Sequence, residues 1–224
     1  MNSTDVKEVL KSHGVTTLYH ANSVITSLSY LKLGGLYSRM QMELHHYSQT
    51  KQYSDDLDKR MKIYNDIFLD SCDIHYQAGD INFYGPIQFQ FDLDVLDKAP
   101  ENAIWITRMN PVKWQSNMSM GQKYFLTIND LDRYFCSTDF GQSITIHNFS
   151  EPLPFQYLKR VVIDDLPELS KKLFLPSYKA IFKACKDRNI EVRIRDNCKP
   201  ECRCLKTYEN MDARCLKNWI LPVE

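Results

Sequence analysis

The segment 85–96, GPIQFQFDLDVL, constrains the fold of this chain more strongly than any other part of the sequence. Its apolar residues stand at every second position, at Ile87, Phe89, Phe91 and Leu93, which is the period of a β-strand with one buried face. Shorter segments of strand character accompany it, namely NAIWITR, QKYFLTI, QSITIHNF and LKRVVIDD. The second half of the chain is therefore predicted to be rich in strands.

The first part of the chain adds helices. Residues 4–12 predict a capped helix, and residues 23–33 predict a second one that ends at two glycines. A strand is predicted to run into His20 between them, and a short second strand follows the glycines. The amphipathic segment 54–70, with acidic residues after Ser54, predicts a further helix with Ser54 as its cap. Together these patterns indicate a mixed α+β domain.

Composition limits the class of protein. With 224 residues, of which 43% are apolar, the chain can bury the core of one globular domain. It contains no apolar run of about eighteen residues and no secretory signal. Its cysteines are odd in number, which fits a reducing compartment better than a disulfide scaffold. We therefore expect a cytoplasmic protein without a membrane partner. A net charge of zero argues against a highly basic protein that coats nucleic acid. P-loop, GxGxxG, HExxH and GxSxG motifs are missing, which leaves the commonest nucleotide, zinc-protease and serine-hydrolase classes without support.

Four segments carry a resemblance to a known family. They are YHANSVITSLSYLKLGGLYSR, LDKRMKIYNDIFLDSCDIH, YGPIQFQFDLDVL and ITIHNFSEPLPFQYLKRVVIDD. Their order, which spans approximately residues 16–165, resembles the ADP-ribosyltransferase fold and, within it, the DarT-like toxins that modify nucleic acid. The resemblance implies an α+β fold with a split β-sheet and flanking helices. Residues 1–165 would be the catalytic core, and residues 166–224 a basic, cysteine-rich extension packed on that core.

The same resemblance implies an activity and its substrates. DarT-like enzymes resemble one another in binding NAD in a cleft of the split sheet and transferring ADP-ribose to a base of single-stranded DNA or RNA, as bacterial or phage-defence toxins under the control of an antitoxin protein. The implied NAD-binding residues are His20 for the ribose hydroxyls, the backbone of Ala21 for the nicotinamide amide, Asn22 and Ser23 near the phosphates, and Tyr37, Ser38 and Arg39 beside the nicotinamide ring. Structural explanations also exist, such as a buried, hydrogen-bonded His20, strand packing by Tyr37 and a surface charge at Arg39.

The implied catalytic residues match the family pattern only in part. Arg60 falls where the family has an arginine that holds NAD and acts at the reaction centre, although an ion pair with Asp56 one turn earlier is the alternative. The family also has a glutamate on a late strand, whereas QSITIHNF contains no acid. The candidates for that role are Glu151, in the turn that follows, and Gln142, the neutral isostere at the start of the strand.

Two further function classes stay open at this point. One is an ADP-ribosyltransferase that modifies proteins, which labelled NAD would distinguish by the macromolecule that becomes labelled. The other is a catalytically silent module of the same fold, which the missing strand glutamate favours. Such a module would bind NAD and release no nicotinamide.

Cysteines gather near the C-terminus. Cys198, Cys202, Cys204 and Cys215 offer four thiolates, enough for one tetrahedral zinc ion, although C-x3-C-x-C is not a common finger spacing. The alternative is a set of reduced cysteines in a basic loop. Because four thiolates leave no open position for water, a zinc ion here is expected to fold the tail rather than to catalyse.

The C-terminal part is also the basic part of the chain. Residues 158–217 contain 15 Lys and Arg against 9 Asp and Glu, a net charge of +6. Aromatic residues stand among these charges, at Tyr178, Phe182, Tyr208 and Trp219, and the combination predicts a surface for single-stranded nucleic acid. The alternatives are a solvated basic face and aromatic side chains that belong to a core.

Overall fold

The structure is a computed structural model of the chain and describes residues 1–196, 198–212 and 216. The helices are α1 (Ser3–Ser12), α2 (Val24–Leu33), α3 (Arg39–Leu44), α4 (Asp55–Met61), α5 (Ile74–Ala78), α6 (Met120–Lys123), α7 (Ile128–Tyr134), α8 (Glu168–Asp187) and α9 (Cys204–Asn210). The strands are β1 (Leu18–Asn22), β2 (Gly35–Leu36), β3 (Ile67–Leu69), β4 (Ile87–Phe91), β5 (Ile104–Ile106), β6 (Ile144–Ile146), β7 (Leu153–Pro154), β8 (Leu158–Ile163) and β9 (Val192–Ile194). Within the described residues, no helix combines the length and hydrophobicity that a membrane crossing requires.

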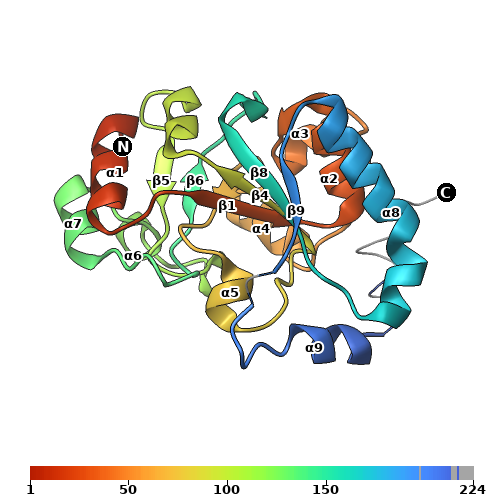
Figure 1. Cartoon of the computed structure of the whole chain (residues 1–224). Coiled ribbons are helices and arrows are strands. Elements are labelled where there is room, and N and C mark those ends of the chain that lie inside the picture. The colour runs from red at the N-terminus through yellow and green to blue at the C-terminus, as the bar shows by residue number, and fades with distance from the viewer. Residues whose placement is uncertain (197, 213–215, 217–224) are drawn as a thin grey trace.

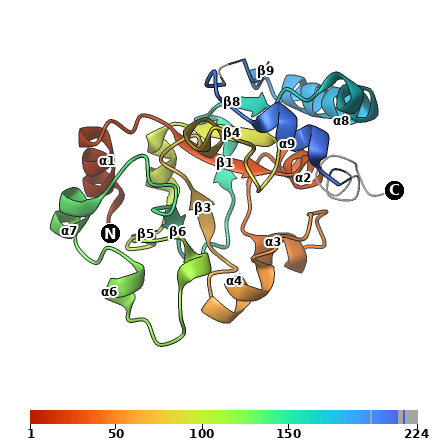
Figure 2. The ribbon, with the colours of Figure 1, turned by 90° about the horizontal axis from the view of Figure 1, so that it is seen from below.

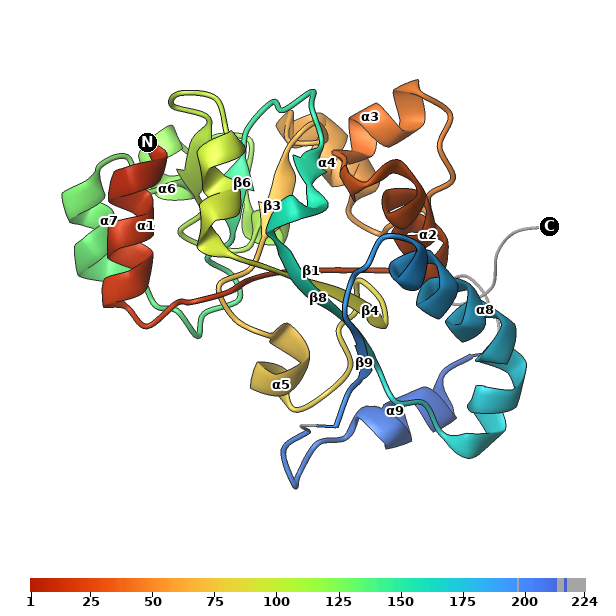
Figure 3. The same ribbon diagram turned by 45° about the horizontal axis from the view of Figure 1, so that its top comes forward.

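The strands divide into separate sheets, which confirms the predicted α+β fold with a split sheet and flanking helices. The largest sheet has the strand order β1-β4-β8-β9, another has the order β3-β6-β5, and β2 pairs with β7. Helices α1, α6 and α7 gather at one end of the molecule, and α2, α3 and α8 gather at the other (Figures 1 and 3). The sheets therefore lie between two groups of helices.

The two larger sheets meet where β1 passes β3. The backbones of Tyr19 and Asp70 exchange two hydrogen bonds there, of 2.9 and 2.8 Å. A second long-range pairing joins β2 to β7, with Gly35 opposite Pro154. These pairings bring the segments that follow β1, β2 and β3 into the same part of the fold as the turn that precedes β7.

Helix α2 begins and ends as its sequence predicts. The Ser23 hydroxyl accepts a hydrogen bond from the backbone N–H of Thr26, and Gly34 ends the helix in the left-handed conformation, at φ 88°. The backbone N–H of Gly34 donates to the carbonyl of Tyr30 at 2.8 Å. These local signals fix the position of α2 directly after β1.

Three predicted elements are wrong in extent. The helix predicted over 54–70 ends at Met61, because Lys62 adopts a left-handed conformation, and its last apolar residues form β3 instead. The strand predicted through Leu93 ends at Phe91, because Asp92 caps a 3-10 turn with its side chain. The predicted strand QKYFLTI contributes a single bridge, between Thr107 and Tyr124, and the flanking residues belong to α6 and α7.

Strand β4 lies at the centre of the largest sheet. Ile87, Phe89 and Phe91 are completely buried, as the alternation of the sequence predicts. On the far side of β8, the C-terminal segment adds β9 in parallel, with Val162 opposite Arg193, and α8 packs against α2. Helices α5 and α9 lie below this sheet in Figure 1, and α9 is in front in the view from below (Figure 2).

Candidate active site

His20 lies in β1, and its imidazole ring is fixed by the backbone of β3. Nδ1 donates a hydrogen bond to the carbonyl oxygen of Phe68 at 2.9 Å, so Nε2 is the acceptor atom, with the amide nitrogen of Asn22 at 3.4 Å. Burial, and to a smaller extent the positive charge of Arg39, lowers the pKa of His20 to about 4, although the hydrogen bond to Phe68 opposes this. His20 is therefore neutral at physiological pH and presents a hydrogen-bond acceptor.

The end of β1 is packed tightly against the loop that precedes β4. Gly85 has φ +140°, and a Cβ at this position would lie 2.3 Å from backbone atoms of Asn22. Ala21 is buried and pairs with β4. Asn22 Oδ1 accepts the backbone N–H of Ser23 at 2.9 Å, and Ser23 Oγ donates to Thr50 Oγ1 at 2.7 Å. The side chains of Asn22 and Ser23 thus hold the start of α2 in this structure.

Arg39 is the first residue of α3. The helix is capped by Ser38, whose hydroxyl also donates to Asn65 Oδ1 at 2.7 Å. Arg39 forms an ion pair with Asp55, with 2.6 Å between Nε and Oδ1, and its Nη2 donates to Asp55 Oδ2 at 2.8 Å and to the carbonyl of Thr50 at 2.9 Å. Its Nη1 is buried and has no hydrogen-bond partner among the described residues. One terminal nitrogen of the guanidinium, with its two N–H donors, is therefore left over.

Tyr37 and Glu151 lie close together because β2 pairs with β7. The ring of Tyr37 contacts that of Tyr47 edge-on, with 5.9 Å between the centroids. Burial raises the pKa of Tyr37, and the charges of Tyr47 and Glu151 add to this effect. Glu151 is exposed in the turn before β7. The structure therefore brings one predicted NAD-binding residue next to one predicted catalytic residue.

Two acids, Asp70 and Asp58, have pKa values that burial raises. Burial raises the pKa of Asp70 to about 7, helped by the charge of Asp73 and opposed by a hydrogen bond from Ser143 Oγ to Asp70 Oδ1, 3.1 Å long. Burial also raises the pKa of Asp58 to about 6, although the Ser54 hydroxyl and the charge of Arg39 oppose it. Both side chains can therefore exchange a proton near neutral pH.

Tyr84 connects the two acids. Burial of its hydroxyl end raises the pKa of Tyr84 to about 12, although 42% of the residue is exposed, and the negative charges of Asp70 and Asp58 act in the same direction. Arg39 in turn influences the pKa values of both Asp58 and His20. We call these five residues, His20, Arg39, Asp58, Asp70 and Tyr84, the junction cluster, because these charge interactions link them to one another.

An acid lies beside the segment QSITIHNF, which itself contains none. Ser143 lies directly before β6, and its hydroxyl donates a hydrogen bond to Asp70, the residue after the neighbouring strand β3. Sequence reasoning missed Asp70, although the signal was available: it is a polar residue directly after the apolar run Ile67–Leu69, like His20 after its own β-prone run. Asp58 and Tyr84 have no comparable signal.

Two predicted catalytic residues lie apart from this arrangement. Arg60 is exposed in the last turn of α4, and Asp56, the predicted partner, contacts Lys51 instead, at 4.0 Å. Gln142 is buried, and its Oε1 accepts the backbone N–H of Cys136 at 2.8 Å, so its side chain holds the loop before β6. Arg60 thus lies on the surface, and Gln142 has a structural hydrogen bond.

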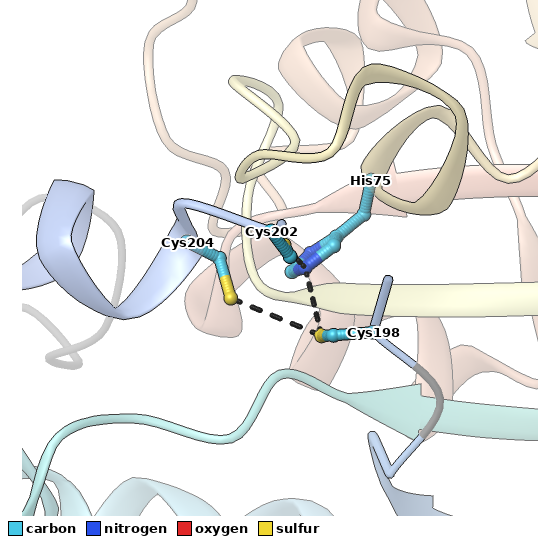
Figure 4. Close-up of side chains that lie close together, drawn as sticks. All are labelled: His75, Cys198, Cys202 and Cys204. Atoms are coloured by element: carbon cyan, nitrogen blue, oxygen red, sulfur yellow. Dashed lines mark hydrogen bonds between the residues drawn. The ribbon is translucent and has the colours of Figure 1, made fainter. Parts of the chain in front are cut away.

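The C-terminal cysteines converge with a residue that sequence reasoning missed. Cys198, Cys202 and Cys204 lie around His75 of α5, and their sulfur atoms and its ring nitrogen are all within 4.8 Å of one another (Figure 4). Cys215, the fourth predicted ligand, lies outside the described residues. No local pattern links His75 to cysteines more than 120 positions away, so only the fold reveals the set.

The predicted stacking surface of the C-terminal part is wrong for two of its aromatic residues. Tyr178 and Tyr208 are buried, and their hydroxyls donate to the backbone carbonyl and to the carboxylate of Asp164. Phe182 is 37% exposed, and Trp219 lies outside the described residues. Exposed aromatic side chains occur instead beside the junction cluster, where Phe83 is 73% exposed.

Comparisons with known proteins give structural similarity and no sequence match. No family model matches the chain, and no curated protein matches it. Three solved structures of Thermus sp. 2.9 DarT are similar to it over 81% of this chain. The complex with ADP-ribosylated ssDNA is 13% identical, with 95% of that chain covered and a TM-score of 0.49. The complexes with carba-NAD+ and with NAD+ are 13% and 14% identical, each with 96% of that chain covered, and have TM-scores of 0.47 and 0.46.

Proposed function

We propose that this protein is an NAD-dependent ADP-ribosyltransferase that modifies a base of single-stranded nucleic acid. The observation that carries the proposal is the junction cluster, in which a neutral histidine, a guanidinium with a free donor and two acids with raised pKa values come together. Titratable groups perturbed by burial and gathered at one place are typical of reaction centres.

The cluster fits the polar parts of NAD. His20 Nε2 is an acceptor for a ribose hydroxyl, and the buried Nη1 of Arg39 is a donor for a pyrophosphate oxygen. Arg39 therefore takes the role that the family resemblance gives to Arg60. The backbone of Ala21 and the ring of Tyr37 keep the nicotinamide contacts that the resemblance implies.

The two acids of the junction cluster act in the transfer step. Bound NAD supplies an ADP-ribosyl group whose bond to nicotinamide breaks, with both electrons moving to the nicotinamide nitrogen. A nucleophilic atom of the base forms the new bond to the same ribose carbon, and Asp70 takes the proton that this atom loses. The ionised carboxylates of Asp58 and Asp70 also stabilise the positive charge that develops on the ribose. Glu151, beside Tyr37, is the competing acid.

A radiolabelled NAD assay tests the function as a whole. Single-stranded DNA, single-stranded RNA, duplex DNA and a protein extract are offered separately, and we expect label in single strands far more than in duplex, because pairing and stacking hide base atoms. Label in the protein extract alone would replace the proposal with a protein-directed transferase. NAD binding without nicotinamide release from any mixture would indicate a silent module.

The toxin role is a further part of the proposal. Induced expression in a bacterial host should stop growth for the wild-type chain and not for Asp70→Asn, if growth arrest depends on transfer. An antitoxin protein would be expected to restore growth in the wild-type strain. Continued growth of the wild-type strain, with active enzyme in its lysate, would contradict the toxin role and leave the enzymatic proposal standing.

His20→Ala should weaken NAD binding without unfolding the chain. Loss of one hydrogen bond at a partly buried site corresponds to about 1 to 3 kcal/mol, or an increase in Kd of about 5- to 150-fold. Thermal-shift titration with carba-NAD+ measures this without turnover. His45→Ala, at an exposed position after α3, is the matched control and should bind like the wild type. Equal stabilisation of His20→Ala and the wild type would remove His20 from the site.

Phe83→Ala should weaken the acceptor strand and leave NAD unaffected. Phe83 is 73% exposed and directly precedes Tyr84 of the junction cluster, two residues before Gly85, whose backbone packs on the end of β1. Stacking of one base on an aromatic ring contributes about 1 to 3 kcal/mol, so KM for single-stranded DNA should rise about 5- to 150-fold. Tyr134→Ala, an exposed aromatic residue on α7, is the control. An unchanged KM in Phe83→Ala would contradict this role.

A further inference from the structure

His75 and three cysteines form a compact set of ligand atoms below the largest sheet. Cys198 Sγ lies 3.5 Å from His75 Nε2 and 3.8 Å from Cys204 Sγ, and Cys202 Sγ lies 3.7 Å from His75 Nε2. The cysteines are not joined in disulfides. All four side chains point toward a common centre, His75 from α5, Cys198 and Cys202 from the segment before α9, and Cys204 from the first residue of α9 (Figure 4).

These distances are those of a tetrahedron around zinc. With Zn–S bonds of about 2.3 Å and Zn–N bonds of about 2.0 to 2.1 Å, tetrahedral angles place two sulfurs about 3.8 Å apart and a sulfur and a nitrogen about 3.6 Å apart. One sulfur–sulfur distance of 3.8 Å and two sulfur–nitrogen distances of 3.5 and 3.7 Å match these values, and the remaining pairs of ligand atoms lie within 4.8 Å. A disulfide would require about 2.05 Å between sulfurs.

The histidine is also oriented as a zinc ligand requires. Its Nδ1 donates to Asp164 Oδ2 at 3.0 Å, which leaves the lone pair of Nε2 directed at the sulfurs. Asp164 is 2% exposed and is itself held by Arg195 Nε and by the Tyr208 hydroxyl, each at 2.7 Å. A carboxylate behind a ligating histidine fixes its tautomer and its ring orientation.

We propose that His75, Cys198, Cys202 and Cys204 bind one Zn²⁺ ion in a closed, structural Cys3His site. The four side chains fill all tetrahedral positions, so the ion has no open position for a substrate or for water. The site is independent of the NAD chemistry proposed above, since none of its ligands belongs to the junction cluster.

The zinc ion would fasten the C-terminal segment to the core. Protein contacts already join this segment to the core: Arg203 N donates to the carbonyl of Gly79 at 2.9 Å, Lys199 Nζ donates to the carbonyl of Gln77 at 3.3 Å, and the buried Tyr208 of α9 donates to Asp164 at 2.7 Å. A metal ion held by α5 and by the C-terminal segment adds stronger bonds to these contacts.

Metal analysis of the purified full chain tests the proposal. Protein produced with zinc in the medium and purified under reducing conditions should contain one equivalent of zinc by mass spectrometry. Cys202→Ser and His75→Ala should each reduce the zinc content strongly, whereas Cys136→Ser, an exposed cysteine outside the set, should retain it. Chelation should expose three further thiols of the wild type to a thiol reagent and lower its melting temperature.

Cobalt substitution keeps the proposal testable if the ligand variants fail to fold. Co²⁺ added to the chelated wild-type chain should give thiolate-to-metal charge-transfer bands and the intense visible bands of a tetrahedral ion. Less than a tenth of an equivalent of zinc in the wild type, together with no such bands, would overturn the site. Each readout is independent of transferase activity, so failure of one proposal is distinguishable from failure of the other.

Discussion

Asp70→Asn lowers the rate of ADP-ribosyl transfer about 10²- to 10⁴-fold, the range expected for loss of a general base, and leaves the affinity for NAD unchanged. The amide preserves the shape of the side chain and can still meet Ser143, but it cannot take a proton. Single-turnover transfer to single-stranded DNA measures the rate, and carba-NAD+ titration measures the affinity.

The role of Asp70 as a base also predicts how the transfer rate changes with pH. A base works in its deprotonated form, so kcat/KM of the wild type should fall as the pH drops through about 7, the value to which burial raises the pKa of Asp70. The folded pKa of Asp70 lies above the unfolded one, so its contribution to stability falls as the pH rises from about 4 to about 7 and stays low above that, and Asp70→Asn should be no less stable than the wild type at pH 8. If Glu151→Gln abolishes transfer and Asp70→Asn does not, the catalytic acid is Glu151.

Gly85→Ala destabilises the folded chain by about 3 kcal/mol or more, near the upper end for single substitutions. The new Cβ would lie 2.3 Å from backbone atoms of Asn22 and 2.4 Å from the backbone nitrogen of Ser23, in a residue whose φ is +140°. Neither backbone can move without disturbing β1 or the start of α2. Urea unfolding followed by circular dichroism measures the free energy of unfolding.

Gly79→Ala is the matched control for this prediction. Gly79 also has a positive φ, of 62°, but a Cβ there has no atom within 4 Å. Its substitution should therefore lower the free energy of unfolding by only about 1 to 2 kcal/mol, the strain of a left-handed residue. Similar losses in Gly79→Ala and Gly85→Ala would show that the close approach of the two backbones contributes little.

Elements whose signals are local were predictable from the sequence. The hydroxyl cap at Ser23 and the glycine at 34 define both ends of α2, and the alternation over Ile87–Phe91 identifies β4. The wrongly predicted ends of two elements also have local causes. Lys62 ends α4 in a left-handed conformation, which the amino-acid pattern does not predict, and Asp92 caps a 3-10 turn where the apolar alternation of the sequence continues.

The family resemblance pointed to His20, Tyr37 and Arg39, which stay predictions as NAD-binding residues. The ion pair that holds Arg39 depends on Asp55, and the acid near β6 follows β3, and neither contact has a signal in the sequence. Such contacts join residues that tertiary structure alone brings together. The same holds for His75, whose partners are in the last part of the chain.

Strand β9 has a consequence for the solubility of the protein. It pairs with Val161–Ile163, the second half of β8, and so covers backbone donors and acceptors that would otherwise be unpaired on that edge. The edge that β9 presents in turn is short, at three residues, and carries the exposed Arg193. Short, charged edges resist pairing with the strands of other molecules. The C-terminal segment therefore protects the largest sheet against aggregation from this side.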